Sequence, residues 1–287
     1  MLPLPFNPPI NKIFLPEFSK NGVEVHIQRD DYLHPFISGN KWRKLKYVVE
    51  DAANKKCNHL VSFGGAYSNH LVALACAGAM LKFKTTAFVR GENVNNHMLN
   101  FCKWYGMNLI FVSREAFKNK IELYEEFAKK NELTYFIDEG GRGELGAKGC
   151  TEIIKEKTGF THTFCAVGTG TTLAGLAINA SQYSIKAEGI CVLKGAEGIN
   201  QDVENIAGIN VPIHHNFHAG GYAKTTPELL SFAKHFAQNT GILLDQIYTA
   251  KLMFGILQLI NQNYFEPNSK ILAIHTGGLL GMLTAIE

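Results

Sequence analysis

The sequence predicts an α/β protein with two open, twisted, mostly parallel sheets flanked by helices. Short apolar runs typical of strands alternate along the chain with helical patterns, and the connections between them are short. The number of strand-like runs favours two such sheets over one. No sequence repeat or low-complexity tract divides the chain. The boundary between the two predicted sheets is therefore inferred, near the glycine-rich region at 140–160.

Composition limits the class of protein. The 287 residues are 46% hydrophobic and 18% charged, as expected for a well-packed globular chain. The net charge of +3 comes without a dense basic block, so we expect no nucleic-acid partner. Six scattered cysteines without a C-x-x-C pair are expected to be reduced and buried. The first residues do not resemble a signal peptide, and no apolar run approaches the roughly 20 residues of a membrane span. We therefore expect a cytoplasmic protein without a membrane partner.

The first half of the chain begins with a proline-punctuated segment and one strand-like alternation at 23–27. A helix is expected to start directly after Gly39 and Asn40. Strands and helices then alternate. The expected strands are 59–63, 85–89, 108–112 and 133–137, and the expected helices run through 70–77, 95–105 and 115–130.

The second half continues this alternation after a glycine-rich turn at 140–149, which we expect to lead into a helix at 151–157. The expected strands are 161–167, 185–193, 209–213 and 271–275, and the expected helices are 173–180, 227–238 and 248–263. Ligands in such folds bind at the carboxyl ends of the strands, so the loops that follow the strands are the candidate sites.

The segment Ser38-Gly39-Asn40-Lys41-Trp42-Arg43-Lys44 concentrates charge at the start of a helix. Three of its last four residues are cationic, although the helix dipole favours anions at this end. A bound anion would resolve the conflict, and solvation of the side chains would also do so.

The segment 166–172 runs from an apolar strand into a helix. Gly168 and Gly170 allow close approach of the backbone to a ligand, and the helix N-terminus offers N–H groups to an anion. The hydroxyls come from Thr169, Thr171 and Thr172. Leu173 stands where a dinucleotide fingerprint requires Gly or Ala, and the acidic ribose-binding residue is missing. The loop therefore favours a single phosphate, and a tight strand–helix turn without a ligand is the alternative.

Three further loops carry polar or glycine-rich patterns that are weak when taken singly. In 62–70, Gly64 and Gly65 precede Ser68, Asn69 and His70, which suits a substrate carboxylate. Ser68 is equally suited to a simple N-cap, and a lone histidine is more often structural. The other two loops are Gly220-Gly221-Tyr222 with 245–251, and the final junction His275-Thr276-Gly277-Gly278.

A phosphate loop, a lysine beside a glycine and the absence of metal-binding motifs together suggest pyridoxal phosphate. In such enzymes a lysine forms a Schiff base with the cofactor aldehyde, and the protein supplies positioning and electrostatics. One alternative is a nicotinamide-dependent oxidoreductase, which Leu173 argues against. Another is a non-catalytic binding protein, which the presence of Lys41 and Ser68 disfavours.

Five motifs occur in an order that resembles one family, the 1-aminocyclopropane-1-carboxylate deaminases and D-cysteine desulfhydrases. The resemblance spans residues 38 to 281. The motifs are Gly39-Asn40-Lys41-x-Arg43-Lys44-Leu45, Gly64-Gly65-x-x-Ser68-Asn69-His70, Gly168-Thr169-Gly170-Thr171-Thr172 with Ala174-Gly175-Leu176, Tyr248-Thr249-x-Lys251 and His275-Thr276-Gly277-Gly278.

The resemblance implies the fold of the tryptophan synthase β-subunit, called fold type II among pyridoxal phosphate enzymes. A larger cofactor domain would comprise residues 1–47 and 159–287, and a smaller inserted domain residues 48–158. The active site would lie between them, and the protein would form a homodimer.

The resemblance also implies roles for individual residues. Lys41 would form the Schiff base and shuttle protons, and Arg43 receives no role. The residues implied to bind the cofactor are Lys41, Lys44, Asn69, Gly168, Thr169, Gly170, Thr171, Thr172 and Thr249. Lys44 would reach the phosphate, Asn69 the ring hydroxyl and Thr249 the pyridine nitrogen. The residues implied to bind substrate are Ser68, Asn69, His70, Tyr222 and Tyr248, with Ser68, Tyr222 and Tyr248 also catalytic.

Residue 249 separates the two activities within the family. The deaminases are implied to carry a glutamate there, whereas this chain has Thr249, as the desulfhydrases do. A neutral hydroxyl supports a protonated ring nitrogen less than a carboxylate does. The sequence therefore favours α,β-elimination from D-cysteine to pyruvate, ammonia and sulfide. Ring opening of 1-aminocyclopropane-1-carboxylate to 2-oxobutanoate and ammonia is the alternative.

Overall fold

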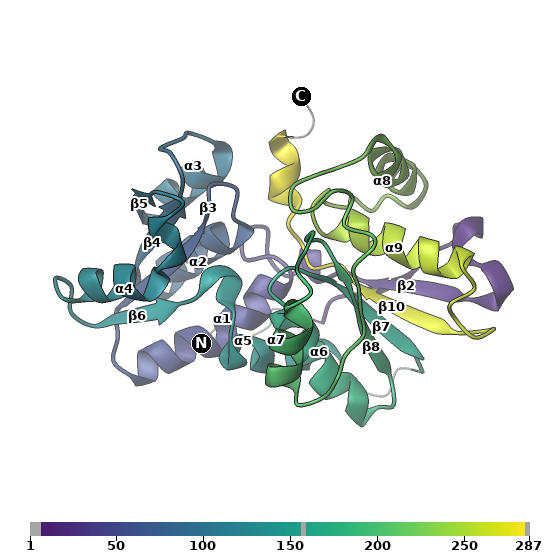
Figure 1. Ribbon diagram of the computed structural model, residues 1–287. Helices are drawn as coiled ribbons and strands as arrows, with labels where there is room; N and C mark the ends of the chain where they lie inside the picture. Colours follow the sequence, from purple (N-terminus) through teal and green to yellow (C-terminus); the bar gives the residue numbers. More distant parts are fainter. Residues whose placement is uncertain (1–6, 156–158, 285–287) are drawn as a thin grey trace.

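The computed structural model describes residues 7–155 and 159–284 and has two lobes, each built on its own sheet (Figure 1). The larger lobe holds a six-stranded sheet in the order β1-β2-β10-β7-β8-β9, and the smaller lobe a four-stranded sheet in the order β5-β4-β3-β6. Neighbouring strands of both sheets are parallel, except that β1 is antiparallel to β2. The predicted class of two mostly parallel sheets with flanking helices is confirmed.

The elements follow each other along the chain in nearly regular alternation. The strands are β1 Ile10–Lys12, β2 Glu24–Gln28, β3 His59–Gly65, β4 Lys84–Arg90, β5 Asn108–Val112, β6 Thr134–Ile137, β7 His162–Val167, β8 Lys186–Cys191, β9 Ile213–His214 and β10 Lys270–Ile274. The α-helices are α1 Asn40–Asn54, α2 Asn69–Leu81, α3 His97–Trp104, α4 Lys120–Ala128, α5 Glu144–Cys150, α6 Thr171–Gln182, α7 Ile199–Ala207, α8 Pro227–Thr240 and α9 Thr249–Asn261.

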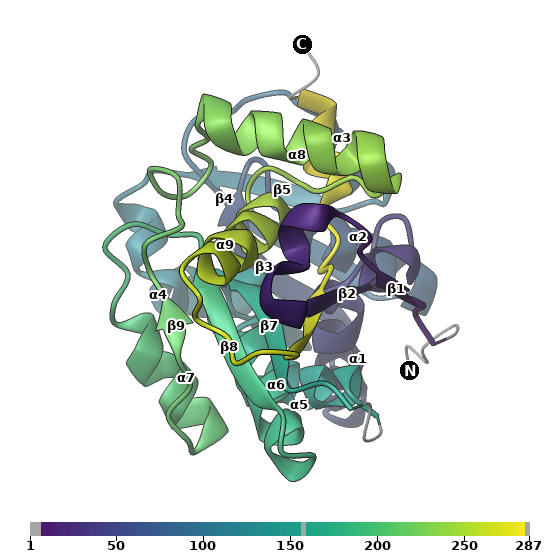
Figure 2. The ribbon, with the colours of Figure 1, turned by 90° about the vertical axis from the view of Figure 1, so that its right-hand side faces the viewer.

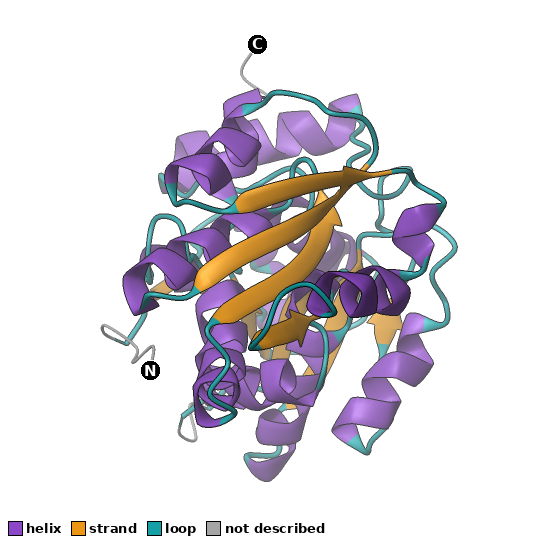
Figure 3. Cartoon of the chain, turned by 90° about the vertical axis from the view of Figure 1, so that its left-hand side faces the viewer, coloured by secondary structure: helices purple, strands orange, loops and turns teal. Residues whose placement is uncertain are grey.

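The smaller sheet lies among helices (Figure 3). Side chains of its strands alternate between two apolar clusters, one on each face. Leu60 of β3 packs in the cluster formed with α1, α2 and α3. The next residue, Val61, packs with Phe63 and Phe88 against Phe117, on the face that α4 covers. Successive side chains of a strand point to opposite faces, so an apolar residue at every position buries both faces of the sheet.

The larger sheet follows the same rule (Figure 2). Phe164 and Ala166 of β7 belong to the cluster that contains the apolar side of α9. Cys165 and Val167, which alternate with them, pack with α6 instead. All six residues of β7 are buried, so it is a strand covered on both faces, and it carries the loop to α6 into the space between the lobes.

Two helix predictions are wrong in detail. The expected helix 115–130 is interrupted at Asn119, which has φ −99 and ψ 58, so a 3₁₀ turn at Ala116–Lys118 precedes the shorter α4. The helix expected at 151–157 begins earlier, as α5, and Thr151–Ile153 is only a 3₁₀ turn. Residues 156 and 157 of that prediction lie outside the described residues.

The glycines at 140–149 were read as a turn, but several of them serve close packing. A Cβ on Gly149 would lie 1.9 Å from the carbonyl oxygen of Arg43, so α5 packs directly against the backbone of α1. Helix α7, which the sequence analysis did not predict, ends at Gly208 in the left-handed conformation with φ 70, an ordinary helix stop.

No helix within 7–155 and 159–284 is long and apolar enough to cross a membrane. The carboxyl ends of β3, β7 and β10 open onto one cavity between the two lobes, because residues that follow each of these strands line it. This is the position at which open parallel sheets bind ligands.

Candidate active site

A cavity of about 880 Å³ lies between the lobes, and both contribute to its wall. The smaller lobe contributes the end of β3 and the start of α2. The larger lobe contributes the loop from β7 to α6, the segments around Tyr222 and Tyr248, and the loop after β10. Helix α1 enters this cavity at its N-terminus, where Gly39 has φ 59 and lies against the backbone of Thr276. The glycine is required there, because a Cβ would lie 1.9 Å from the Thr276 carbonyl oxygen.

Lys41 and Lys44 project from the first turn of α1 toward the same carbonyl group. Their Nζ atoms lie 3.4 Å and 3.1 Å from the carbonyl oxygen of Gly140. Burial lowers the pKa of Lys41 well below its usual value, and the positive charge of Lys44 lowers it further. Burial also lowers the pKa of Lys44. Within the described residues, neither ammonium group has a carboxylate in ion-pair distance.

The loop from β7 to α6 completes an anion site. Gly170 adopts φ 76 and brings the chain into α6, whose first N–H groups are unpaired within the helix. Thr169 packs against Gly140, the residue that accepts from both lysines. Asn40 donates to the Thr172 hydroxyl at 2.8 Å, which ties the start of α1 to the start of α6. Thr171 is fully buried, with its hydroxyl 3.4 Å from that of Thr169.

Two buried ammonium groups without a carboxylate, beside a helix N-terminus, fit a phosphate dianion. Such a group would offset the like-charge repulsion of the lysines and use the free N–H groups of α6. The described residues hold no cluster of three or more His, Cys, Asp or Glu side chains in metal-binding arrangement. The chemistry of the donors thus suits a phosphorylated cofactor.

The loop from β3 to α2 forms the facing wall. Ser68 is the N-cap of α2, and its hydroxyl accepts from the Leu71 N–H at 3.3 Å. Ser68, Asn69 and His70 all line the cavity. Ser68 therefore caps α2, as its sequence position allowed, and it also lines the cavity in which we expect the substrate.

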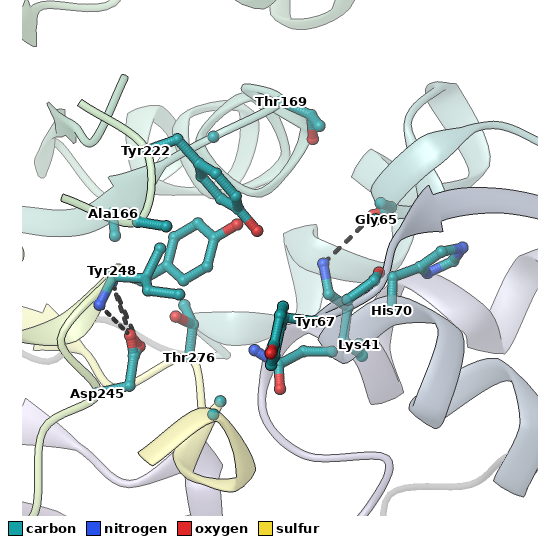
Figure 4. A pocket seen from close by; sticks show the side chains of 18 of the residues that line it. Lys41, Gly65, Tyr67, His70, Ala166, Thr169, Tyr222, Asp245, Tyr248 and Thr276 are labelled. Atoms are coloured by element: carbon teal, nitrogen blue, oxygen red, sulfur yellow. Dashed lines mark hydrogen bonds between the residues drawn. The ribbon is translucent and has the colours of Figure 1, made fainter. Parts of the chain in front are cut away.

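His70 is buried, and its Nε2 lies 2.9 Å from the Ser62 hydroxyl. Its Nδ1 has no hydrogen-bond partner in the described part of the chain. Burial lowers the pKa of His70 well below its usual value, and the nearby lysines add to this effect, so the ring is neutral. In Figure 4 the ring points away from the two tyrosines.

Tyr222 and Tyr248 meet on the large-lobe side of the cavity (Figure 4). Their ring centres are 6.3 Å apart with an edge-to-face angle of 68°. Burial raises the pKa of both phenols, and Tyr222 raises the pKa of Tyr248 further. Both groups therefore remain protonated at neutral pH and can donate a hydrogen bond.

Asp245 and Thr249 form a reciprocal cap at the start of α9. The Asp245 carboxylate accepts from the Tyr248 N–H at 2.6 Å, and the Thr249 hydroxyl accepts from the Asp245 N–H at 2.7 Å. Burial raises the pKa of Asp245 to about 7 in spite of these backbone donors. Thr249 is fully buried and its hydroxyl contacts the backbone of Asp245, so the role toward a ring nitrogen stays a prediction.

The cavity wall contains most of the residues singled out in the sequence. Those that line it are Lys41, Lys44, Ser68, Asn69, His70, Gly168, Thr169, Gly170, Thr172, Tyr222 and Tyr248. Thr171 and Thr249 are buried just behind them. Their roles remain predictions, although the structure brings these distant segments together.

Sequence reasoning gave no role to three residues of the site. Lys251 is fully buried and donates to the Gly221 carbonyl at 2.7 Å, so it holds the loop that carries Tyr222. Asp245 and Arg90 line the cavity as well. Asp245 and Lys251 lie in the loop 245–251 that the sequence analysis singled out, and Arg90 directly follows the predicted strand 85–89, a position typical of ligand-binding residues.

Such a site defines an enzyme that holds a phosphorylated cofactor between two α/β lobes. The family described as pyridoxal-phosphate dependent enzyme matches residues 4–277, and the chain belongs to this family. Its cofactor is accordingly pyridoxal phosphate, as the motifs predicted.

Comparison with individual proteins shows which members of this family the chain is similar to. The chain is 29% identical to the bifunctional D-cysteine desulfhydrase/1-aminocyclopropane-1-carboxylate deaminase of Arabidopsis thaliana, over 97% of this chain and 78% of that protein. It is 30% identical to the D-cysteine desulfhydrase of Klebsiella pneumoniae, over 92% of this chain and 90% of that protein. The crystal structure of an ACC deaminase homologue superimposes with a TM-score of 0.87 at 28% identity, covering 97% and 91% of the two chains. The predicted resemblance is confirmed.

Proposed function

We propose that this enzyme catalyses α,β-elimination from D-cysteine, which yields pyruvate, ammonia and sulfide. The observation that carries this choice over deamination is the residue after Tyr248, a neutral threonine whose hydroxyl is occupied by the backbone of Asp245. A site without a carboxylate at this position stabilises negative charge on the cofactor ring less strongly. Loss of a thiolate from Cβ demands less of the cofactor than opening of a cyclopropane ring.

Lys41 is the residue we propose to hold the cofactor and move the proton at the substrate Cα. When bound, pyridoxal phosphate supplies an electron sink for the charge that develops at that carbon. The lowered pKa of Lys41 increases the fraction of neutral amine, which is the form that accepts a proton. Lys44, its neighbour one helical turn away, would stay with the phosphate.

The two sides of the cavity would orient the substrate. Ser68 and the N–H groups at the start of α2 lie where a carboxylate would be stabilised by the helix N-terminus. Tyr222 and Tyr248, with their protonated phenols, would face the other side of the substrate and donate to the departing group. Lys251 would act indirectly, through Gly221 and the Tyr222 loop.

Deamination of 1-aminocyclopropane-1-carboxylate is the second candidate. The similarity to a relative named for both activities, and to the structure of an ACC deaminase homologue, favours it. Both reactions begin with a small amino acid bound by its carboxylate, so the same cavity would serve either one.

Product analysis separates the two reactions. We expect purified holoenzyme to release pyruvate and sulfide from D-cysteine, with Lys41→Ala inactive and the surface variant Lys55→Ala unchanged. L-cysteine and 1-aminocyclopropane-1-carboxylate are assayed in parallel. Release of 2-oxobutanoate from the latter without pyruvate from D-cysteine would replace the proposed reaction by deamination.

We also propose the division into a larger domain of residues 1–47 and 159–287 and an inserted domain of residues 48–158. The separate sheet formed by strands β3 to β6 supports it. A homodimer in the cytoplasm is proposed from the family resemblance, and light scattering of the purified protein would test the dimer.

A further inference from the structure

Arg90 extends along the smaller-lobe wall of the cavity, beside the loop proposed to bind the substrate carboxylate. It is the last residue of β4, and its register partner is Gly65 at the end of β3. Its Nη2 lies 3.8 Å from the point that a Cβ on Gly65 would occupy. Its guanidinium carbon lies 5.3 Å from the centre of the Phe117 ring. A cation–π contact with Phe117 thus stabilises this position of the Arg90 side chain.

The charge on this wall is not neutralised by ion pairs. Arg90 and Arg114 both line the cavity, and in the described part of the chain neither has a carboxylate within 4.0 Å. Glu92 lines the same wall and, within residues 7–155 and 159–284, forms no ion pair, so two guanidinium groups stand against this one carboxylate there. Glu139, also at the cavity, is engaged by Lys120 at 3.1 Å.

Arg90 and Tyr222 line the same cavity from different lobes. Gly65 and Tyr222 lie on facing sides of the cavity (Figure 4). Burial raises the pKa of Tyr222, and the positive charge of Arg90 opposes this effect in small part. Because Arg90 lines the cavity and its Nη2 lies beside Gly65, a group bound at this wall would be within reach of the guanidinium.

We propose that Arg90 is a specificity-determining residue that favours amino acids whose β-substituent carries a second anionic group. This inference rests on the proposed elimination reaction and extends its substrates from D-cysteine to derivatives that carry an acidic group on the sulfur. The loop from β3 to α2 would hold the α-carboxylate, and the second anion would meet the guanidinium beside Gly65. Arginine suits this task because its planar fork binds carboxylates and phosphates through two parallel hydrogen bonds.

The reaction on such a substrate is the same elimination. The Cα–H bond gives its proton to the base, and the leaving group departs from Cβ with the bonding electron pair and takes up a proton. One water molecule then hydrolyses the unsaturated amino acid to pyruvate and ammonia. No oxidant or reductant is needed, and the anionic group leaves as part of the released thiol.

Two substrates that differ only in charge test this proposal. S-carboxymethyl-D-cysteine and its amide, S-carbamoylmethyl-D-cysteine, have nearly equal size and the same bond to break. Their dissociation constants for the holoenzyme are measured by calorimetry, and pyruvate release is measured alongside. We expect the carboxymethyl compound to bind roughly five- to tenfold more tightly, as for a charge-assisted contact at a partly exposed site.

Substitutions of Arg90 test whether this residue causes the difference between the two dissociation constants. Arg90→Gln should bring the ratio of the two dissociation constants to about one, Arg90→Lys should restore part of it, and the surface control Lys103→Gln should retain the wild-type ratio. A wild-type ratio near one, or a ratio that survives in Arg90→Gln, would overturn the proposal. Absence of pyruvate from D-cysteine would contradict the elimination reaction alone, because the binding ratio still decides the role of Arg90.

Discussion

Arg43 and Asp30 form a buried, bidentate ion pair, with Nε 2.6 Å from Oδ2 and Nη2 3.0 Å from Oδ1. Arg43 also donates to the Glu152 carbonyl at 2.9 Å. The pair connects the first turn of α1 to the segment after β2, two residues from Lys41 along the chain. Arg43, the cation of the 41–44 segment that had no predicted role, is thus structural.

We predict that Arg43→Met lowers the free energy of unfolding by about 3–5 kcal/mol, because it leaves the Asp30 carboxylate buried without its partner. Urea denaturation measures the loss. Lys46→Met is the control, since Lys46 pairs with Glu152 in a partly exposed position and should cost less than about 1 kcal/mol. If both variants lose a similar free energy of unfolding, burial of the Arg43–Asp30 pair does not determine the size of the loss.

Lys41→Ala should yield a folded protein that lacks the visible yellow colour of bound pyridoxal phosphate. Removal of the amine removes the group that bonds to the cofactor aldehyde. The wild-type colour should disappear on borohydride reduction, and circular dichroism should report an unchanged fold in the variant. Retention of a reducible yellow colour by Lys41→Ala would assign the covalent bond to another lysine.

Lys44→Met should affect the apoprotein and the cofactor complex in opposite directions. The apoprotein should become no less stable, since one of two buried ammonium groups that share the Gly140 carbonyl is gone. The affinity for pyridoxal phosphate should fall roughly 10- to 100-fold, as expected for one lost charge-assisted contact.

Equilibrium dialysis gives the affinity of Lys44→Met for the cofactor, and thermal unfolding of the apoprotein gives its stability. Lys55→Met, on the surface end of α1, serves as the matched control. If cofactor affinity is unchanged in Lys44→Met, this lysine does not contact the phosphate.

Asp245 should give the apoprotein a measurable pH dependence. Its pKa is raised from 3.8 to about 7 by burial, so between these values the folded state binds more protons than the unfolded state. Its contribution to stability therefore decreases as the pH rises from about 4 to 7. Asp245→Asn keeps an oxygen that can cap α9 and should flatten this slope. Parallel stability curves of the two proteins over this range would contradict the raised pKa.

Ser68 should show two separable effects. Ser68→Ala removes the N-cap of α2 and should cost about 1 kcal/mol of stability. Ser68→Asn retains a capping oxygen, so it should be nearly as stable as wild type, but it lacks the hydroxyl. If that hydroxyl takes part in the reaction, kcat/KM falls in both variants, and kinetics of the stable Asn variant measure this. Wild-type kcat/KM in Ser68→Asn would restrict the residue to capping.

Most strands were predictable because local patterns determine them. The strand expected at 209–213 is an exception, because only Ile213–His214 pair as β9, and β1 was not predicted. Residues 108–112 were predicted at the observed bounds, and β7 and β10 within one residue at each end. A doubly buried strand needs apolar side chains at consecutive positions, which is visible in any window of the sequence. Helix bounds were predicted less well at 115–130, where a break at Asn119 depends on how the 3₁₀ turn packs Phe117 into the core.

The candidate site was predictable where glycines and helix starts had to occur together. Gly39, Gly168 and Gly170 marked the loops that now line one cavity. The packing role of the glycines near α5 was not predictable, because Gly149 is needed only for the contact with Arg43. A glycine in sequence shows freedom of the backbone but not the neighbour that requires it.

The sequence by itself determined the two-sheet α/β class and the loops of the site, because each depends on neighbours along the chain. It also indicated the pyridoxal phosphate cofactor, through motifs that occur in a family order over residues 38 to 281. The tertiary structure decided which groups neutralise, orient or oppose each other. Arg43 meets Asp30 across 13 residues, Lys251 meets Gly221 across 30, and Lys44 meets Gly140 across 96. Charge and burial act through space, so these partners, and with them the shifted pKa values of the site, appear only when the chain is folded.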